Sequence, residues 1–341
     1  MDKLPAWARR FVDNWETQQL EQLRKSEVGR SLVIRHPDDM NSSNITQFAS
    51  VIPDTDRLFK KCPETTSQAH VPSGTITQHK NWDQSIVYPG TMRDFDVYVP
   101  PGTQPGETLG LIFIADGKAA WQFATKFSVV LDNMIHENRI PRCVLVLAGV
   151  GWEPATGATR MEEKQMFPTG MPGYLQRWRE LDVCSEEYGQ MVVEEMLPWI
   201  EQEHNITFTK DPSLRCMGGQ SSGGLCAFNV AWTRPEDFGL IFGVSTSFPN
   251  CMPGYLLPKE VRRERKKNLR VALLVGEFDT NNEDGCWCEH TELMRSALNF
   301  KGYENLVEVA KGGGHTLRYA GMRMAHVLEW LFVHSVSKAK L

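Results

Sequence analysis

After residue 80 the chain alternates short apolar runs with segments of helical periodicity, and this alternation constrains the possible folds strongly. The clearest runs are LGLIFIAD (109–116), CVLVLAGV (143–150), LRCMG (214–218), FGLIFGVS (238–245) and LRVALLVG (269–276). Continuous apolar runs are typical of strands buried on both faces, and strands that alternate with helices form parallel sheets. The sequence therefore predicts an α/β fold, with a mostly parallel central sheet and helices on both faces.

The remaining segments complete the predicted order. Further strands are expected at DFDVYVP (94–100) and NLVEVA (305–310), and helices at 119–136, 186–204, 222–232, 289–301 and 321–336. We divide the chain into an N-terminal extension, residues 1–75, and a main α/β domain, residues 76–341, with a lid-like insertion at 151–183. The extension is predicted to hold one amphipathic helix, at 5–25, and a polar, irregular segment that runs from about 36 to 80.

The composition disfavours some classes of partner. The 341 residues carry a formal net charge of −5, so no basic field attracts a phosphate backbone, and nucleic acid is not expected as a partner. The first residues lack the apolar stretch of a secretory signal, and no later stretch reaches the ~18 apolar residues that a membrane-spanning helix needs. We therefore predict a soluble, cytoplasmic protein, with a homodimer left open.

Cysteine usage gives no sign of a metal or disulfide framework. The eight cysteines are scattered without regular spacing, which favours free thiols in a reducing compartment. Cys286 and Cys288 are too close together, and lack a second pair, for a zinc site. No nucleotide-binding motif is apparent, so neither a metal nor another cofactor is expected.

Glycines surround two adjacent serines at residues 219–223 (GQSSG), between an apolar run and a helical pattern. This is the G-x-S-x-G pattern in the strand, turn and helix context that a nucleophile elbow requires. Small neighbours two residues to either side let the chain turn sharply without collision. The register selects Ser221 as the nucleophile, because a motif centred on Ser222 would need a glycine in place of Gln220.

A serine nucleophile needs a base, and the base needs an acid that orients it. In hydrolases built on such a sheet the order along the chain is serine, acid, histidine. His315 lies in a glycine-rich loop (KGGGHTL) after the last apolar run and is predicted to be the base. The preceding strand is followed by VGEFDTNNEDG, in which Asp279 is the favoured acid and Glu277 and Asp284 are the alternatives.

Attack on an ester carbonyl creates an oxyanion, which needs backbone N–H donors. One donor is expected from the residue after the nucleophile, here Ser222, and a second from the loop after an earlier strand. The stretch FIADGKAAW (113–121) supplies such a loop. We therefore expect the backbone of Gly117 or Lys118 to complete the oxyanion hole, although the same residues also suit a simple turn.

Four tryptophans are candidates for substrate binding. Trp121 and Trp287 follow loops at the predicted catalytic edge, in positions suited to stacking on a substrate ring. Trp152 and Trp178 belong to the insertion, which is rich in methionine and aromatic residues. Such a segment suits a lid or an acyl pocket, with packing against the sheet as the alternative.

Charged side chains of the insertion largely cancel one another. Its basic residues Arg160, Lys164, Arg177 and Arg179 are offset by Glu162, Glu163, Glu180 and Asp182. We expect Arg177 and Glu180 to pair with each other rather than to bind an anionic substrate.

Several of these motifs together resemble a known family. RCMGGQSSGGLCAFNVAWTRPEDFG, FIADGKAAW, VGEFD, GGGH and RWREL (177–181) are similar to the putative-esterase branch of the α/β-hydrolases, which contains enterochelin (siderophore) esterases, esterase D and feruloyl esterases. The resemblance covers roughly residues 74–336 and implies a triad of Ser221, Asp279 and His315. The N-terminal segment and residues 151–176 match nothing in that pattern, so the resemblance does not carry over a substrate.

The sequence thus predicts a serine hydrolase that cleaves a carboxylic ester or lactone through an acyl-enzyme on Ser221. Acyl transfer to an acceptor other than water is the alternative, because some relatives in this branch perform it. A catalytically dead binding protein is disfavoured by the intact serine and histidine.

Overall fold

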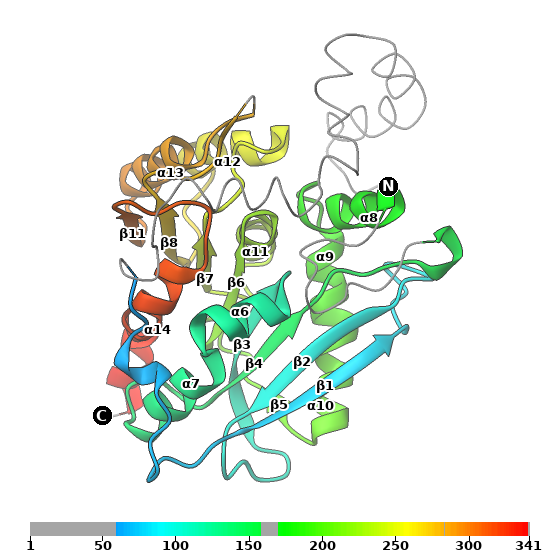
Figure 1. Ribbon diagram of the computed structural model, residues 1–341, viewed down its shortest axis with the longest axis vertical. Helices are drawn as coiled ribbons and strands as arrows, with labels where there is room; N and C mark the ends of the chain where they lie inside the picture. Colours follow the sequence, from blue (N-terminus) through cyan, green and yellow to red (C-terminus); the bar gives the residue numbers. More distant parts are fainter. Residues whose placement is uncertain (1–58, 158–169, 283, 340–341) are drawn as a thin grey trace. The chain divides into compact units, whose positions relative to one another are not determined.

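A central sheet of nine strands organises the part of the chain that the computed structural model describes, residues 59–157, 170–282 and 284–339 (Figure 1). Its strands are β1 (Thr75–Trp82), β2 (Arg93–Val99), β3 (Thr108–Ala115), β4 (Cys143–Ala148), β5 (Thr207–Phe208), β6 (Arg215–Gln220), β7 (Leu240–Val244), β8 (Arg270–Gly276) and β11 (Glu304–Ala310). Eight of them follow in the order β1-β2-β4-β3-β6-β7-β8-β11, and β5 pairs with β3. Among these described strands the only antiparallel pairs are β1 with β2 and β2 with β4. A separate two-stranded ribbon joins β9 (Asn281–Asn282) to β10 (Gly285–Cys286).

Helices cover both faces of the sheet (Figure 1). They are α6 (Lys118–Thr125), α7 (Phe127–His136), α8 (Gly170–Leu181), α9 (Glu187–Gln190), α10 (Leu197–His204), α11 (Ser222–Thr233), α12 (Met252–Arg263), α13 (Trp287–Lys301) and α14 (Arg318–Ala339). A π-helical segment (Met191–Met196) joins α9 to α10, and short 3₁₀ turns lie at Pro63–Thr65, Pro154–Thr156 and Pro212–Leu214. Helices α6, α7 and α14 share one hydrophobic cluster with the sheet, and α10 to α13 share the other.

Strand β3 shows why the apolar runs are continuous. Leu111 and Phe113 belong to the cluster on one face of the sheet, whereas Ile112 and Ile114 belong to the cluster on the other. Because successive side chains of a strand point to opposite faces, a strand covered by helices on both sides needs apolar residues at every position. The predicted α/β fold with a mostly parallel sheet is confirmed.

The edge of the sheet differs from the prediction. The polar segment expected to be irregular as far as residue 80 forms β1 from Thr75 onward. This strand pairs with β2 alone among the described strands, and most of its side chains are exposed or half-buried. An edge strand with so little burial needs no alternation of apolar and polar residues, so no pattern in the sequence predicted it. The amphipathic helix expected at 5–25 lies outside the described residues.

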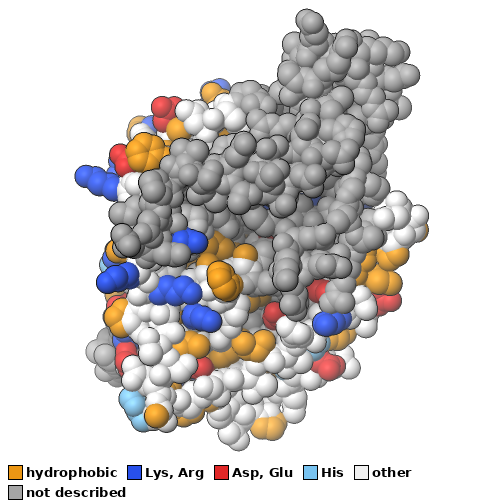
Figure 2. All heavy atoms as spheres, viewed as in Figure 1, with side chains coloured by type: hydrophobic (Ala, Val, Ile, Leu, Met, Phe, Trp, Pro, Cys, Tyr) orange, Lys and Arg blue, Asp and Glu red, His pale blue; other side chains and the backbone are white. Residues whose placement is uncertain are grey.

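The described surface mixes charged and apolar side chains. Figure 2 shows basic, acidic and hydrophobic side chains interspersed on one face. Strongly exposed large apolar side chains include Phe123 on α6, 78% exposed, and Phe278 after β8, 64% exposed. In the part of the chain described, no helix combines the length and the apolar character needed to cross a lipid bilayer.

Two imidazoles pair at the edge of the sheet. His79 of β1 and His204 at the end of α10 have their Nε2 atoms 2.9 Å apart, and the His79 ring also lies edge-on to Trp199. Burial lowers the pKa of both rings, and for His204 the neighbouring imidazole adds to the effect, although Glu203 and, for His79, Asp96 act in the opposite direction. The pair therefore favours the neutral state.

We expect this pair to make the folded protein less stable as the pH falls from about 7 to 5. Above the ordinary histidine pKa of 6.5 both folded and unfolded chains are neutral here, whereas below it the unfolded chain binds protons that the folded pair resists. Thermal melts followed by circular dichroism should show a smaller fall in Tm across this range for His79→Gln than for the native protein. His136→Gln, at an exposed histidine, is the matched control and should keep the native dependence. Equal falls in the native protein and His79→Gln would contradict this assignment.

Candidate active site

Four neighbouring parallel strands bring the candidate residues to one edge of the sheet. Ser221 follows β6, Asp279 follows β8 and His315 follows β11, while the loop after β7 lies between the first two. The carboxyl ends of parallel strands meet at the same edge, where ligands bind in sheets of this kind. Residues almost a hundred positions apart in the sequence therefore share one site.

Ser221 occupies a sharp turn between β6 and α11. Its backbone has φ 57° and ψ −123°, a conformation rarely adopted by residues other than glycine, which costs about 1–3 kcal/mol. A Cβ on Gly219 would lie 2.3 Å from the carbonyl carbon of Gly223, and a Cβ on Gly223 would lie 2.4 Å from the carbonyl oxygen of Ala115 on β3. The glycines are therefore required by close backbone contacts on both sides of the serine.

His315 and Asp279 form a short hydrogen bond. The His315 Nδ1 and Asp279 Oδ1 atoms are 2.6 Å apart, and the Asp279 side chain is fully buried. Its other oxygen accepts a hydrogen bond of 2.5 Å from the Ser245 hydroxyl, and the Thr280 backbone N–H donates to Oδ1 at 2.7 Å. Burial acts to raise the pKa of Asp279, but the interactions with His315, Ser245 and Thr280 outweigh it and hold this pKa below its usual value.

An ionised carboxylate can only accept hydrogen bonds, so His315 donates through Nδ1. The other ring nitrogen, Nε2, is then free of a proton in the neutral imidazole and can accept one. The His315 side chain is one-quarter exposed, so its ring reaches the surface of the described structure. The pair thus has the arrangement of a general base held by an acid.

The alternative acids occupy other positions. Glu277 is exposed and accepts a hydrogen bond from the Gly312 backbone N–H at 3.0 Å, and Asp284 lies exposed between β9 and β10. Neither is a hydrogen-bond partner of His315 among the described interactions. The glycine loop before His315 packs directly on β8, since a Cβ on Gly276 would lie 2.5 Å from the Gly313 oxygen.

The loop after β7 contributes two serines that the sequence reasoning missed. Ser245 bonds Asp279, and the Ser247 hydroxyl lies 3.1 Å from the Ser221 hydroxyl oxygen. In the described structure Ser221 Oγ is paired with Ser247 and not with His315. Catalytic hydrogen bonds are often long or unformed without substrate. The signal was the sequence STS directly after an apolar run, at the same sheet edge as the other motifs.

The candidate oxyanion donors lie at two helix starts beside each other. Lys118 begins α6 after Gly117, which has φ 73°, and Ser222 begins α11. The strands that precede these helices, β3 and β6, are neighbours with Ala115 opposite Gly219. The first N–H groups of a helix have no partner within it, so both turns present backbone donors at the sheet edge that also holds Ser221.

A buried arginine forms hydrogen bonds with a residue of each turn. Arg177 of α8 donates to Asp116 Oδ2 through Nη2 at 2.7 Å and Nε at 3.1 Å, and to the Ser222 hydroxyl through Nη1 at 3.2 Å. Asp116 directly precedes Gly117 and has a positive φ of 65°. The expected pairing of Arg177 with Glu180 is wrong: Arg177 pairs with Asp116, whereas Glu180 forms a buried ion pair of 2.7 Å with Arg93.

The four tryptophans have different surroundings. Trp121 is fully buried between Phe127 and Phe242, and Trp152 is 6% exposed. Full burial of Trp121 in the core, where helix α6 turns it onto the sheet, contradicts its expected role in substrate binding, whereas for Trp152 that role stays a prediction. Trp178 on α8 is half-buried. Trp287 is 4% exposed, lies edge-on to His315 with ring centres 6.3 Å apart, and donates to the Ser247 hydroxyl.

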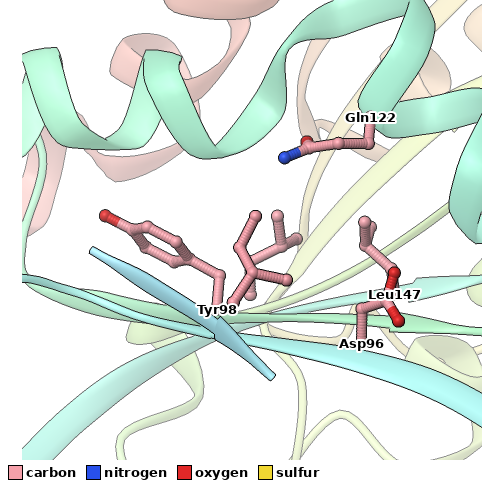
Figure 3. Close-up of a pocket in the computed structure, with 6 residues that line it drawn as sticks. Asp96, Tyr98, Gln122 and Leu147 are labelled. Carbon is pink, nitrogen blue, oxygen red and sulfur yellow. The ribbon is translucent and has the colours of Figure 1, made fainter. Parts of the chain in front are cut away.

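A small cavity lies elsewhere in the fold (Figure 3). It has a volume of about 20 Å³, room for about one water, and is lined by Ile76, Asp96, Tyr98, Gln122, Leu145 and Leu147. Figure 3 shows Asp96 and Tyr98 on the sheet, on the face that lies across from Gln122 of α6. No candidate catalytic residue lines it, so it is not part of the site.

The sheet order, the serine turn and the helices on both faces define the chain as an α/β-hydrolase. A family model described as "Putative esterase" matches residues 87–330. The chain belongs to this esterase family, and it is accordingly a carboxylic ester hydrolase. The resemblance that the sequence motifs indicated is confirmed.

Similar proteins are found at low sequence identity. The uncharacterized protein YbbA of Bacillus subtilis (strain 168) is 22% identical over 267 residues, in an alignment that covers 76% of this chain and 96% of YbbA. The enterobactin esterase FES from Shigella flexneri superposes with a TM-score of 0.58 at 17% identity, over 80% of this chain but only 62% of that one. The ferulic acid esterase from Anaeromyces mucronatus gives a TM-score of 0.56 at 14% identity, over 79% and 95%.

Proposed function

We propose that the protein hydrolyses a carboxylic ester or lactone through an acyl-enzyme on Ser221, with His315 as general base and Asp279 as the acid that orients it. The observation that carries this proposal is the 2.6 Å bond between His315 and the buried, ionised Asp279, at the sheet edge that also presents Ser221. This bond fixes the tautomer in which Nε2 can take the serine proton.

In the proposed reaction the Ser221 oxygen attacks the ester carbonyl carbon while its proton passes to His315 Nε2. The resulting oxyanion accepts hydrogen bonds from the backbone N–H of Ser222 and from Gly117 or Lys118. Collapse breaks the bond to the alcohol, which leaves with the proton from Nε2. Water then attacks the acyl-enzyme by the same route and releases the carboxylic acid.

The proposal is tested by intact-mass spectrometry during turnover of a panel of p-nitrophenyl esters and lactones. We expect a mass increase equal to the acyl group, which peptide mapping places on Ser221, and labelling of the same residue by a fluorophosphonate. A matching increase on another residue, or turnover without any acylated species at rapid quench, would count against it. Adding a primary alcohol tests acyl transfer, because a transferase would form the new ester in preference to the free acid.

A further inference from the structure

The loop after β7 holds the candidate nucleophile at two points. The Ser247 backbone N–H donates to the Ser221 carbonyl oxygen at 3.1 Å, and the two hydroxyl oxygens are 3.1 Å apart. Ser247 is 1% exposed. The buried Ser247 hydroxyl therefore restricts the position of the Ser221 oxygen, because hydroxyl groups removed from water retain their hydrogen bonds.

Trp287 determines how the Ser247 hydroxyl is used. Its indole Nε1–H donates to Ser247 Oγ at 3.2 Å. Indole nitrogen is a donor only, so the serine oxygen accepts there and its own O–H remains to be directed elsewhere. Among the described hydrogen bonds its other partner is Ser221 Oγ. The chain therefore runs from Trp287 to Ser247 to Ser221, and each bond polarises the next.

We infer that Ser247 is a positioning residue that donates a hydrogen bond to Ser221 Oγ and is itself oriented by Trp287. Ser247 uses its own proton for this hydrogen bond, so the Ser221 proton remains available for transfer to His315. As Ser221 gives up that proton, its oxygen gains negative charge, and a hydrogen bond to a charged oxygen is stronger than one to a neutral hydroxyl. The Ser247 bond therefore favours the acylation step; Ser247 keeps its own proton throughout.

This inference rests on the proposed role of Ser221, and its test uses the rate of acylation. We expect Ser247→Ala to lower the burst rate of p-nitrophenol release and the rate of fluorophosphonate labelling about tenfold, with little change in KM. Ser247→Thr retains the hydroxyl and should restore most of the rate. Ser296→Ala, at an exposed serine on α13, is the control that should leave the rate unchanged.

The link to Trp287 is tested by a double-mutant cycle. Trp287→Phe keeps an aromatic ring but removes the indole N–H, so it should slow acylation less than Ser247→Ala does. In the double variant the loss should equal that of Ser247→Ala alone, because the indole acts through the serine. Fully additive losses would overturn the chain of hydrogen bonds. Melting temperatures close to native in each variant separate this effect from unfolding.

The outcomes also separate this inference from the proposed function. An inactive Ser221→Ala beside a fully active Ser247→Ala would overturn the role of Ser247 and leave the nucleophile in place. An active Ser221→Ala would overturn both. A lower rate in Ser247→Ala that Ser247→Thr does not restore, accompanied by a lower Tm, would assign Ser247 a packing role instead.

Discussion

Ser221→Ala is expected to lower kcat for p-nitrophenyl ester hydrolysis by at least about 10³-fold and to abolish fluorophosphonate labelling. The substitution removes the oxygen that is proposed to form the acyl-enzyme, while the backbone donors of the proposed oxyanion hole can still support a slow background reaction. Stability should change little, because the lost side chain makes a single neutral hydrogen bond, to Ser247. Steady-state kinetics and thermal melts on the purified variant check both expectations.

The adjacent Ser222 provides a matched control. Its hydroxyl accepts a hydrogen bond from Arg177, which keeps its two bonds to Asp116 when that hydroxyl is removed. The proposed contribution of Ser222 is its backbone N–H, which alanine retains. Ser222→Ala should therefore keep at least about one-tenth of the native kcat, the loss expected for one buried hydrogen bond. Similar losses in the two variants would show that the register of the serine motif has been misread.

Asp279→Asn is expected to lower kcat about 10⁴-fold, the scale seen when the same change is made in a serine protease triad. The amide can present its N–H₂ group to His315 Nδ1, which forces the proton onto Nε2 and leaves no acceptor for the serine proton. Ser221 labelling should slow in parallel, because it depends on the same base. The variant should still fold, since the amide occupies nearly the same volume as the carboxylate.

The neighbouring carboxylates test whether the effect is specific to Asp279. Glu277→Gln alters an exposed side chain that bonds the Gly312 backbone, and Asp284→Asn alters an exposed residue between β9 and β10. Both variants should remain within about threefold of native kcat, because neither carboxylate contacts His315 in the described structure. A loss of several orders of magnitude in Glu277→Gln, with Asp279→Asn active, would transfer the role of the acid to Glu277.

Local patterns predicted much of the fold. Buried parallel strands such as β3 and β8 could be predicted because burial on both faces demands an apolar residue at every position. Strand β1 was not, since an edge strand with exposed side chains has no such requirement. Helix α12 was not predicted either; it begins at Met252 with a proline at its second position, and another proline lies inside it. Tertiary packing overrides weak propensity in such segments.

The tryptophans show where position along the chain is a poor guide. Trp121 and Trp287 both follow loops at the same edge of the sheet, and both were expected to bind substrate. Helix α6 turns Trp121 into the core, whereas α13 begins at Trp287 and directs its indole N–H to Ser247. Which way a side chain faces depends on the rotation of its helix over the sheet, and no local pattern at these two positions encoded it.

The amino-acid sequence was enough to predict the fold class, the esterase family and the strained turn at Ser221, because each depends on short-range requirements: apolar strands, small residues around a tight turn, and a glycine loop beside a histidine. The folded structure was needed to show that Asp279 bonds His315, that Arg177 contacts both Asp116 and Ser222, and that Ser247 contacts Ser221. Each of these contacts joins residues at least 26 positions apart in the sequence. Such pairings arise from the order of β3, β6, β7, β8 and β11 in the sheet, which is fixed by packing of the whole domain.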